Sequence, residues 1–380
     1  MLPQFYQTHL QGQLIPTDYL LLACLIRLLQ RIKQVRLESL ATALPLPILF
    51  ESRRRKLQRF LLLPQISFKT LWFPILLAWV KENYTRQEYL YLSLDRTTWG
   101  NINLLMISLI VDKRAIPIYG QLLEKSGSSN LVEQQRVISP VLELLKNYRV
   151  MVLGDREFCS VKLGNWLKEE RTNYCLRLKR DEYVEREQGL WVELQQLGLK
   201  PGHRLFLEGV RVTKLKGAKP FNVAAKWQRT YRTQRAAEGW FILTNLTTVE
   251  QAIAAYRKRF GIEEMFRDFK SGGYHLEDTA VREERFMSLV VMVTLAYAAA
   301  TLQGQRIKQK GVQKYVGRVK ESGRTQRRHS NFYIGLHGQD WVNTDPEMAE
   351  LIQELMQLNR HKWADYQRGI RAQELIRQAL

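Results

Sequence analysis

Residues 256–270 of this 380-residue chain read YRKRFGIEEMFRDFK, and the stretch as a whole favours a helix. With about 100° of rotation per residue, an arc of about 80° carries Tyr256, Arg259, Glu263, Arg267 and Lys270. A separate apolar stripe carries Ile262, Met265, Phe266 and Phe269. Such a helix packs by its apolar stripe and presents one carboxylate among cations. The alternative is a charged face that is simply solvated.

Four of these residues, Tyr256, Arg259, Glu263 and Lys270, fit the spacing Y-x2-R-x3-E-x6-K. The pattern resembles the signature of the DDE transposases of bacterial insertion sequences, specifically insertion sequence family four, the cut-and-paste group. Glu264 lies about 100° from Glu263 around the helix, so only Glu263 shares the charged arc. The resemblance implies two further aspartates, which must lie at the ends of suitable strands upstream.

Upstream of this helix, the apolar pattern changes to short runs separated by turns. The runs at 89–94, 104–111 and 115–119 predict an antiparallel meander, with Asp112 as a hairpin turn residue. The following elements are expected to be a helix at 131–146, a strand at 149–153, a helix at 161–170 and a strand at 174–178. This is the element order of an α/β ribonuclease H-like fold, in which the first and fourth strands are neighbours in a mixed sheet.

Two aspartates follow the first and fourth predicted strands. Asp95 lies in LSLDRTT (92–98) and ends the first strand, and Asp155 lies in VLGDREF (152–158) and ends the fourth. If these strands are adjacent, both carboxylates emerge at one edge of the sheet, where Glu263 can join them. An aspartate after a strand is also a common turn or cap residue, an alternative that stays open for Asp155. In GDREF, Arg156 and Phe158 resemble the family's second-aspartate motif.

Three converging carboxylates repel one another unless cations neutralise them. Oxygen ligands favour Mg2+, for which Mn2+ substitutes, whereas zinc prefers His or Cys. We therefore predict that Asp95, Asp155 and Glu263 are catalytic and bind two metal ions. Two ions would stabilise both the attacking and the leaving oxygen of an in-line phosphoryl displacement.

A long segment, 181–239, separates the fifth strand from the return strand at 240–243. It alternates apolar and polar residues, and a structureless loop of this length is improbable within a compact domain. We predict an inserted β subdomain, which the resembled family also carries here, and a catalytic core of residues 86–180 and 240–305. In related enzymes a Trp at the start of a similar strand stacks on a base flipped out of a DNA hairpin. Trp240 is the candidate for that role, with an ordinary core Trp as the alternative.

The net charge of +21 and the pI near 9.9 favour a polyanionic partner, nucleic acid first. Residues 1–85 are expected to form short helices at 18–33, 37–44 and 48–63. The last of these carries Arg53, Arg54, Arg55, Lys56 and Arg59. This arrangement suits a helix-turn-helix-like module whose last helix contacts DNA. The alternative is a helical bundle with a solvated basic face.

Residues 286–305 form an uncharged run long enough to consider as a membrane span. Its Ser, Thr, Tyr and Gln residues favour a buried core helix instead. Residues 306–380 are interpreted as a basic linker, 306–328, followed by a helical region that by resemblance mediates dimerisation. The three scattered cysteines show no zinc spacing and suit a reducing cytoplasm, and the N-terminus lacks the features of a signal peptide.

These observations and the resemblance together predict a transposase that nicks the ends of its own insertion sequence and uses the freed 3′-hydroxyl to attack DNA. By resemblance, excision passes through a hairpin, Arg259 and Lys270 contact phosphates near the cut, and Tyr256 contacts or orients the same backbone. The expected partners are the terminal inverted repeats, target DNA and a second copy in the synaptic complex. We expect a bacterial cytoplasmic protein, nucleoid-associated when bound to DNA. The alternatives are an inactive transposase-derived DNA-binding protein and a ribonuclease H-fold nuclease or resolvase.

Overall fold

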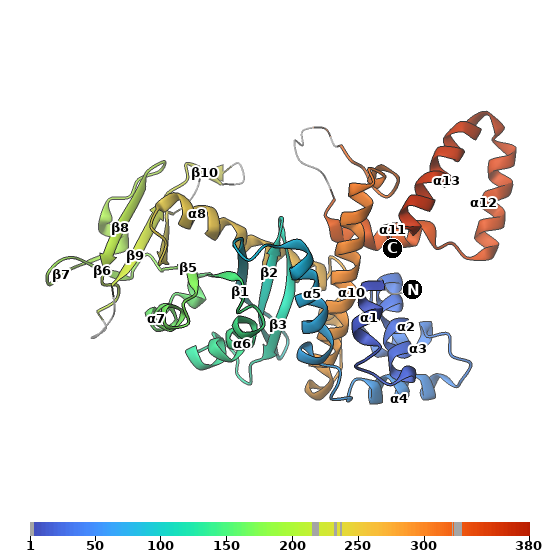
Figure 1. The fold of residues 1–380 in the computed structure, drawn as a ribbon, viewed down its shortest axis with the longest axis horizontal. Coiled ribbons are helices and arrows are strands. Elements are labelled where there is room, and N and C mark those ends of the chain that lie inside the picture. The colour runs from blue at the N-terminus through green and yellow to red at the C-terminus, as the bar shows by residue number, and fades with distance from the viewer. Residues whose placement is uncertain (1–3, 215–219, 232–233, 236–237, 321, 323–328) are drawn as a thin grey trace. The chain divides into compact units, whose positions relative to one another are not determined.

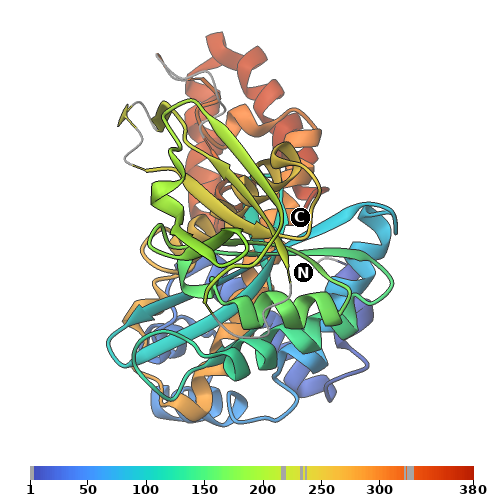
Figure 2. The ribbon, with the colours of Figure 1, turned by 90° about the vertical axis from the view of Figure 1, so that its left-hand side faces the viewer.

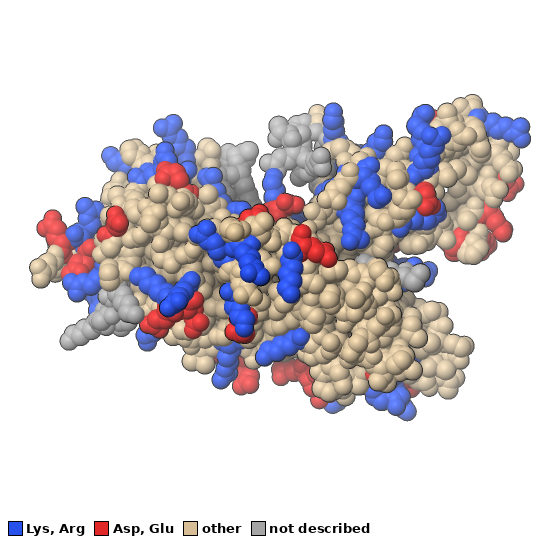
Figure 3. All heavy atoms as spheres, viewed as in Figure 1, with Lys and Arg blue, Asp and Glu red and all other residues tan. Residues whose placement is uncertain are grey.

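A computed structural model describes residues 4–214, 220–231, 234–235, 238–320, 322 and 329–380. The chain divides into two compact units (Figure 1). The first, Leu76–Phe266, contains the sheet, and the second, Met1–Ile75 with Arg267–Leu380, is helical. Basic side chains outnumber acidic ones on the face drawn in Figure 3, in keeping with the net charge of +21.

The sheet of the first unit has eight strands in the order β3-β2-β1-β4-β5-β12-β9-β8. In that order they are β3 (Arg114–Leu122), β2 (Ile102–Val111), β1 (Tyr89–Trp99), β4 (Arg149–Gly154), β5 (Asn173–Arg177), β12 (Trp240–Thr244), β9 (Phe221–Lys226) and β8 (Arg204–Val210). β1 is parallel to β4, and β4 is parallel to β5, whereas the other neighbours are antiparallel. The predicted ribonuclease H-like core, with its first and fourth strands adjacent, is confirmed.

Helices cover both faces of this sheet (Figures 1 and 2). α6 (Leu131–Leu144) packs on β2 and β3, and α7 (Val161–Glu169) packs on β5. α8 (Val249–Arg257) packs against β4, β5, β9 and β12 on the other face. Because side chains alternate along a strand, every second residue of β4 reaches the α8 side. The resulting core cluster includes Met151, Leu153, Ile253 and Tyr256.

The first predicted strand differs from the observed one at the point that concerns the site. β1 does not end at Asp95 but runs on to Trp99, paired with β2. Only its parallel pairing with β4 ends there, at Leu94 opposite Gly154. The pattern of apolar residues does not reveal this extension, because residues 95–99 are mostly polar. They are held in the strand by backbone pairing with β2. The β2–β3 turn is as predicted, with Asp112 at a positive φ of 54°.

The expected β insertion is built differently from an independent subdomain. β6 (Tyr183–Glu187) and β7 (Leu190–Glu193) form a two-stranded sheet, as do β10 (Thr230–Tyr231) and β11 (Gln234–Arg235). β8 and β9, however, extend the main sheet through β12. β12 pairs with β5 along one of its edges. Its other edge would be exposed, but β9 pairs with it there. Parts of the predicted insertion, 215–219, 232–233 and 236–237, lie outside the described residues.

The helix predicted over 256–270 is not continuous. α8 ends at Arg257, a 3-10 turn spans Lys258–Phe260, and α9 covers Gly261–Phe269. A Cβ at Gly261 would lie 3.0 Å from the carbonyl carbon of Arg114, so the chain passes close to the β3 backbone at this point. A contact between residues so far apart in the sequence has no local signature, and the prediction of one regular helix was wrong there.

The second unit consists of helices, several within a few residues of their predicted bounds. They are α1 (Gln4–Leu10), α2 (Pro16–Ile32), α3 (Leu37–Ala43), α4 (Phe50–Phe60), a π-helical turn (Phe68–Trp72), α10 (Glu283–Gln309), α11 (Asn331–Val342), α12 (Pro346–Leu358) and α13 (Trp363–Arg377), while α5 (Phe73–Asn83) spans the boundary between the units. Three glutamines link α2, α10 and α11, because Gln339 Nε2 donates to Oε1 of Gln30 at 3.1 Å and of Gln303 at 2.7 Å.

α10 is the central helix of this unit. It is long and apolar enough to cross a membrane, but 89% of its most apolar window is buried inside the protein. Its neighbours also use its polar groups: Tyr6 donates to the carbonyl of Leu295, and Ser288 donates to that of Ile66. The interpretation of 286–305 as a buried core helix is therefore confirmed. Of the basic stretch that follows, residues 321 and 323–328 lie outside the described part of the chain.

Candidate active site

The two aspartates lie where the parallel pairing of β1 with β4 ends. Leu94 of β1 pairs with Gly154 of β4, so Asp95, which is still within β1, and Asp155, which follows β4, are the next residues of the two segments. The two lie close enough to interact, because the charge of Asp155 raises the pKa of Asp95. The register of one parallel pair thus brings together two carboxylates that are far apart in the sequence.

Glu263 joins this edge through Arg259. The Arg259 guanidinium contacts Asp95 Oδ2 at 3.3 Å through Nη1 and Glu263 Oε1 at 2.5 Å through Nη2. The Arg259 side chain is only 7% exposed and that of Asp95 15%, whereas Glu263 is 45% exposed. The result is a buried cation between two of the three predicted acidic residues.

The acidity of Asp95 is strongly perturbed. Its pKa is raised to about 7, mainly because the carboxyl is buried; Arg259 opposes this rise, and the nearby carboxylates of Asp155 and Glu263 add to it. The desolvation of an anion and repulsion by like charges both favour the protonated form. A cation that binds beside such a carboxyl group stabilises its ionised form.

Asp155 also has a structural role in this arrangement. Its Oδ1 accepts the backbone N–H of Glu157 at 2.8 Å, which caps the 3-10 turn Arg156–Phe158. The capping alternative considered for Asp155 is therefore realised. The cap holds the aspartate at the end of β4, at the sheet edge where Asp95 also lies.

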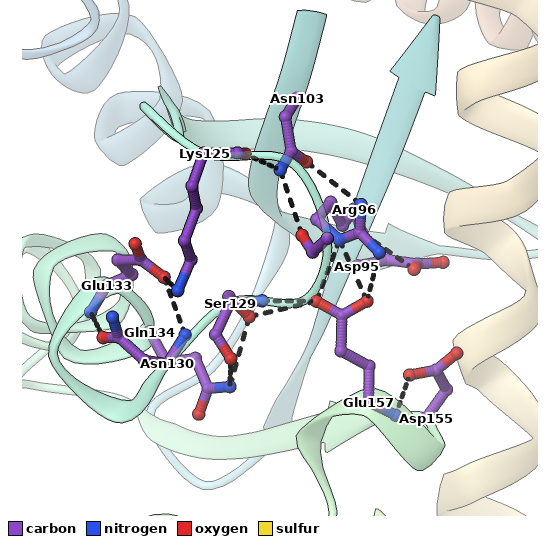
Figure 4. Close-up of polar contacts among 11 residues, drawn as sticks. Asp95, Arg96, Asn103, Lys125, Ser129, Asn130, Glu133, Gln134, Asp155 and Glu157 are labelled. Carbon is purple, nitrogen blue, oxygen red and sulfur yellow. Dashed lines mark hydrogen bonds and ion pairs between the residues drawn. The ribbon is translucent and has the colours of Figure 1, made fainter.

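A second ion pair, which the sequence did not predict, joins β1 to the 3-10 turn after β4, next to the two aspartates (Figure 4). Arg96 contacts both carboxylate oxygens of Glu157 at 2.9 Å, and Ser129 donates to the same carboxylate. Although burial raises it, the hydrogen bonds from Arg96 and Ser129 leave the pKa of Glu157 below its usual value. Arg96 directly follows Asp95, and Glu157 lies two residues after Asp155. The sequence feature that could have indicated this ion pair is the charged residue next to each aspartate, in D-R at 95–96 and in D-R-E at 155–157.

Tyr256 and Trp240 form an aromatic wall beside Arg259. Tyr256 is fully buried and meets the Trp240 ring edge to face, with centroids 5.3 Å apart. The guanidinium carbon of Arg259 lies 5.9 Å from the Tyr256 ring centroid and 4.8 Å from that of Phe260. Trp240 is half-buried and also contacts Phe260. Tyr256 therefore packs beside the Arg259 guanidinium within the core.

The cations of α4 have different surroundings. Arg53 donates to three backbone carbonyls: Ala41 at 2.8 Å, Ile48 at 3.0 Å and Leu46 at 3.3 Å. Arg54 pairs with Glu38 and Glu51, and Arg55 pairs with Glu51. Among the described residues, the side chains of Lys56 and Arg59 have no such partner, and Arg59 is exposed. The predicted basic face is thus partly neutralised, by Glu51 one turn earlier in the same helix and by Glu38 of α3.

Two further basic features are Lys270, which is a predicted DNA-binding residue, and a hollow that the sequence did not predict. Lys270 lies in the turn after α9, within the helical unit, and burial lowers the pKa of its ammonium group while Glu277 opposes that shift. Next to Asp155, a hollow of about 440 Å3 is lined by Arg156, Lys179, Arg180, Asp181 and Gln195. Its lining has three cations and one anion, so it favours an anionic occupant.

The donor set at the sheet edge suits a hard divalent cation. Asp95, Asp155 and Glu263 offer only carboxylate oxygens, the ligands that Mg2+ and Mn2+ prefer. In the part of the chain that the structure describes, no three His, Cys, Asp or Glu side chains are gathered closely enough to hold an ion as they stand. The ligand types therefore fit such a metal, and the Arg259 guanidinium lies between two of the three carboxylates.

The profile of a protein family described as "Transposase DDE domain" matches residues 95–299, more than half of the chain. The matched segment begins at Asp95 and includes Asp155 and Glu263. No curated protein matches the chain. A solved structure, a piggyBac transposase synaptic complex with hairpin DNA, is similar at 16% identity and a TM-score of 0.38. That similarity covers 76% of this chain and 59% of the piggyBac chain.

Proposed function

This chain belongs to the transposase DDE domain family, and from that premise we propose that it moves its own insertion sequence by cut-and-paste transposition. The family makes it a DNA transposase acting in DNA recombination. The observation that carries the finer proposal is the pairing of Leu94 with Gly154, which delivers Asp95 and Asp155 to one sheet edge. Glu263 is tied to the same edge by Arg259.

In this proposal Asp95, Asp155 and Glu263 hold two Mg2+ ions, which when bound stabilise the attacking and leaving oxygens of the phosphoryl transfer. The protein keeps Asp95 in a buried environment and joins β1 to the turn after β4 through the Arg96–Glu157 pair. Arg259 and Lys270 contact phosphates near the cut. Tyr256, being buried against Arg259, orients that guanidinium and does not itself bind DNA. Water attacks one phosphodiester of the first strand and releases a 3′-hydroxyl. That hydroxyl then attacks a phosphodiester of the opposite strand, which closes the hairpin and releases the 3′-oxygen of the flanking DNA.

The test is cleavage of DNA that carries the ends flanking the chain's own gene, with and without Mg2+. We expect metal-dependent nicking by the native protein and none by Glu263→Gln. The matched control is Glu264→Gln, since Glu264 pairs with Arg114 at 3.1 Å on the other side of the helix. Its loss breaks one partly exposed ion pair, worth about 1 kcal/mol or less.

Three specific outcomes would contradict the proposal. Metal-dependent cleavage by Glu263→Gln at the native rate would remove Glu263 from the site. End binding without cleavage by the native protein would favour the inactive DNA-binding alternative. That alternative draws some support from Asp155, whose carboxylate is used as a cap. Cleavage without any strand transfer would instead indicate a nuclease or resolvase.

Trp240 is proposed to stack on a base extruded at the hairpin. Its half-buried ring packs on Tyr256 and Phe260, so truncation to Ala would also disturb the core. Trp240→Phe keeps a ring in place but offers less stacking area, and base stacking contributes about 1–3 kcal/mol. We expect hairpin formation to slow by about tenfold while the first nick is nearly unchanged. Equal loss of both steps, together with a lower melting temperature, would show that Trp240 serves the core alone.

We propose that the N-terminal helices bind the ends of the insertion sequence through Lys56 and Arg59 of α4. Arg59→Ala should weaken DNA binding and lower the slope of log K against log salt by about one, with no change in melting temperature. Arg53→Ala should instead destabilise the helical unit by about 1–3 kcal/mol, because it leaves the carbonyls of Ala41, Leu46 and Ile48 without their donor. If Arg59→Ala bound its ends with the native affinity and salt slope, α4 would not be the DNA-contacting helix.

A homodimer in the synaptic complex is also part of this proposal. α12 has no buried residue, although Met348, Leu351, Ile352 and Leu355 form an apolar stripe at helical spacing. An isolated helix of this length is marginal in water, so a partner surface would stabilise it. The helix carries three acids and no base, and the following Arg360–Lys362 turn is basic, which suits pairing between two copies. Sedimentation of a single copy with each bound end would contradict the dimer.

A further inference from the structure

Arg259 occupies the position from which a metal ion would have to contact two carboxylates at once. Its Nη1 and Nη2 contact Asp95 Oδ2 and Glu263 Oε1, and these are oxygens that the proposed function assigns to metal. A guanidinium and a divalent cation cannot share these oxygens, because the two positive charges repel each other at close range. In the described chain, moreover, the carboxylates are not gathered into a metal-binding group.

The surroundings of Arg259 favour a side chain with a second position. Its Nε is buried and has no hydrogen-bond partner among the residues that the structure describes. A buried donor without an acceptor costs about 1–3 kcal/mol. The side chain is therefore not fully satisfied where it lies. A phosphate group offers several acceptor oxygens in a geometry that a guanidinium matches with two parallel hydrogen bonds.

We propose that Arg259 is an internal counter-ion that closes the metal site in the absence of DNA and leaves it when a DNA phosphate offers a stronger partner. This inference rests on the proposed function, since it takes Asp95 and Glu263 as metal ligands. It adds that metal loading and DNA binding are coupled through one side chain. The coupling keeps the enzyme weakly loaded with metal until its substrate is bound.

The coupling follows from competition for the same charge. Without DNA, the positive charge of Arg259 lowers the affinity of the carboxylates for a divalent ion. With DNA, the guanidinium is drawn toward the phosphate and the carboxylates become available. By linkage, a metal ion must then also strengthen DNA binding by the same factor as DNA strengthens metal binding.

The experiment is a Mn2+ titration of the full chain at pH 8, in which electron paramagnetic resonance reports free Mn2+. We compare the native protein with Arg259→Met, which removes the charge and keeps the length of the side chain. The control is Arg257→Met, because Arg257 is exposed two residues away and carries the same charge. We expect Mn2+ to bind Arg259→Met at least about tenfold more tightly than the native protein, with Arg257→Met unchanged.

A second measurement tests the effect of DNA on Mn2+ binding, and its main comparison, native protein with and without duplex, does not depend on any variant. A duplex of arbitrary sequence should tighten Mn2+ binding to the native chain and should have much less effect on Arg259→Met. If Arg259→Met is misfolded, Arg259→Gln takes its place. Unchanged or weaker Mn2+ binding in a folded variant, or no effect of duplex on the native chain, would overturn the inference. Because neither readout requires cleavage, tighter Mn2+ binding in a protein that never cuts DNA would refute the proposed function alone.

Discussion

Asp95→Asn abolishes metal-dependent strand cleavage and, without metal, makes the protein more stable at pH 8. Mainly because of burial, the pKa of Asp95 is raised to about 7, far above the ordinary value for an aspartate. The folded chain therefore binds its proton more tightly than the unfolded chain does. Ionising Asp95 costs folding free energy, and the protein loses stability as the pH rises from about 4 to 7. Asparagine removes that cost because it carries no charge.

The expected gain for Asp95→Asn is about 2 kcal/mol in the free energy of unfolding at pH 8, shrinking as the pH falls toward 4. Melting curves in EDTA at pH 5 and pH 8 measure it, beside cleavage with Mg2+. The matched control is Asp112→Asn in the β2–β3 turn, where asparagine tolerates the positive φ of 54°. Asp112→Asn should change neither the free energy of unfolding nor the rate of cleavage. Cleavage by Asp95→Asn within tenfold of the native rate would exclude Asp95 from the catalytic site.

Gly335→Ala should be the most destabilising single-methyl addition in the helical unit. α10 and α11 cross so closely that a Cβ at Gly335 would lie 1.7 Å from the carbonyl oxygen of Ala300. Gly304 faces the same crossing, with a Cβ that would lie 1.8 Å from the carbonyl oxygen of Asn331. The obstacle is backbone, so no side chain can turn aside to relieve the clash. We expect a loss of about 3 kcal/mol or more.

The control for this substitution is Gly369→Ala in α13. A Cβ there meets nothing within 4 Å, and replacing a helical glycine by alanine is worth about 0.5–1 kcal/mol in stability. The two variants add the same methyl group to helices of the same unit. Thermal unfolding should therefore shift in opposite directions. A Gly335→Ala protein that melts with the native one would show that the helices separate at no cost.

Local patterns in the sequence were enough to predict the strands and helices around Asp95 and Asp155. Their order matches a ribonuclease H-like fold, and that fold places the two strands side by side. Apolar runs of β length and their spacing encode strands, and a parallel pair delivers the residues that follow it to one edge. The polar residues of 286–305 likewise indicated a buried helix before the structure showed its partners. These features depend on neighbours in the sequence, which is why a single chain reveals them.

Tertiary structure alone decided how the charges are used. Arg259 bridges Asp95 and Glu263, Arg53 binds backbone carbonyls, and β9 continues the main sheet. Each of these outcomes depends on which groups a folded chain brings within a few ångströms. Periodicity places a residue on a face of its own element, but it does not tell which distant group meets that face. The amino-acid sequence was therefore sufficient to identify the family resemblance and the three acidic residues. Only the fold showed that Arg259 lies between Asp95 and Glu263.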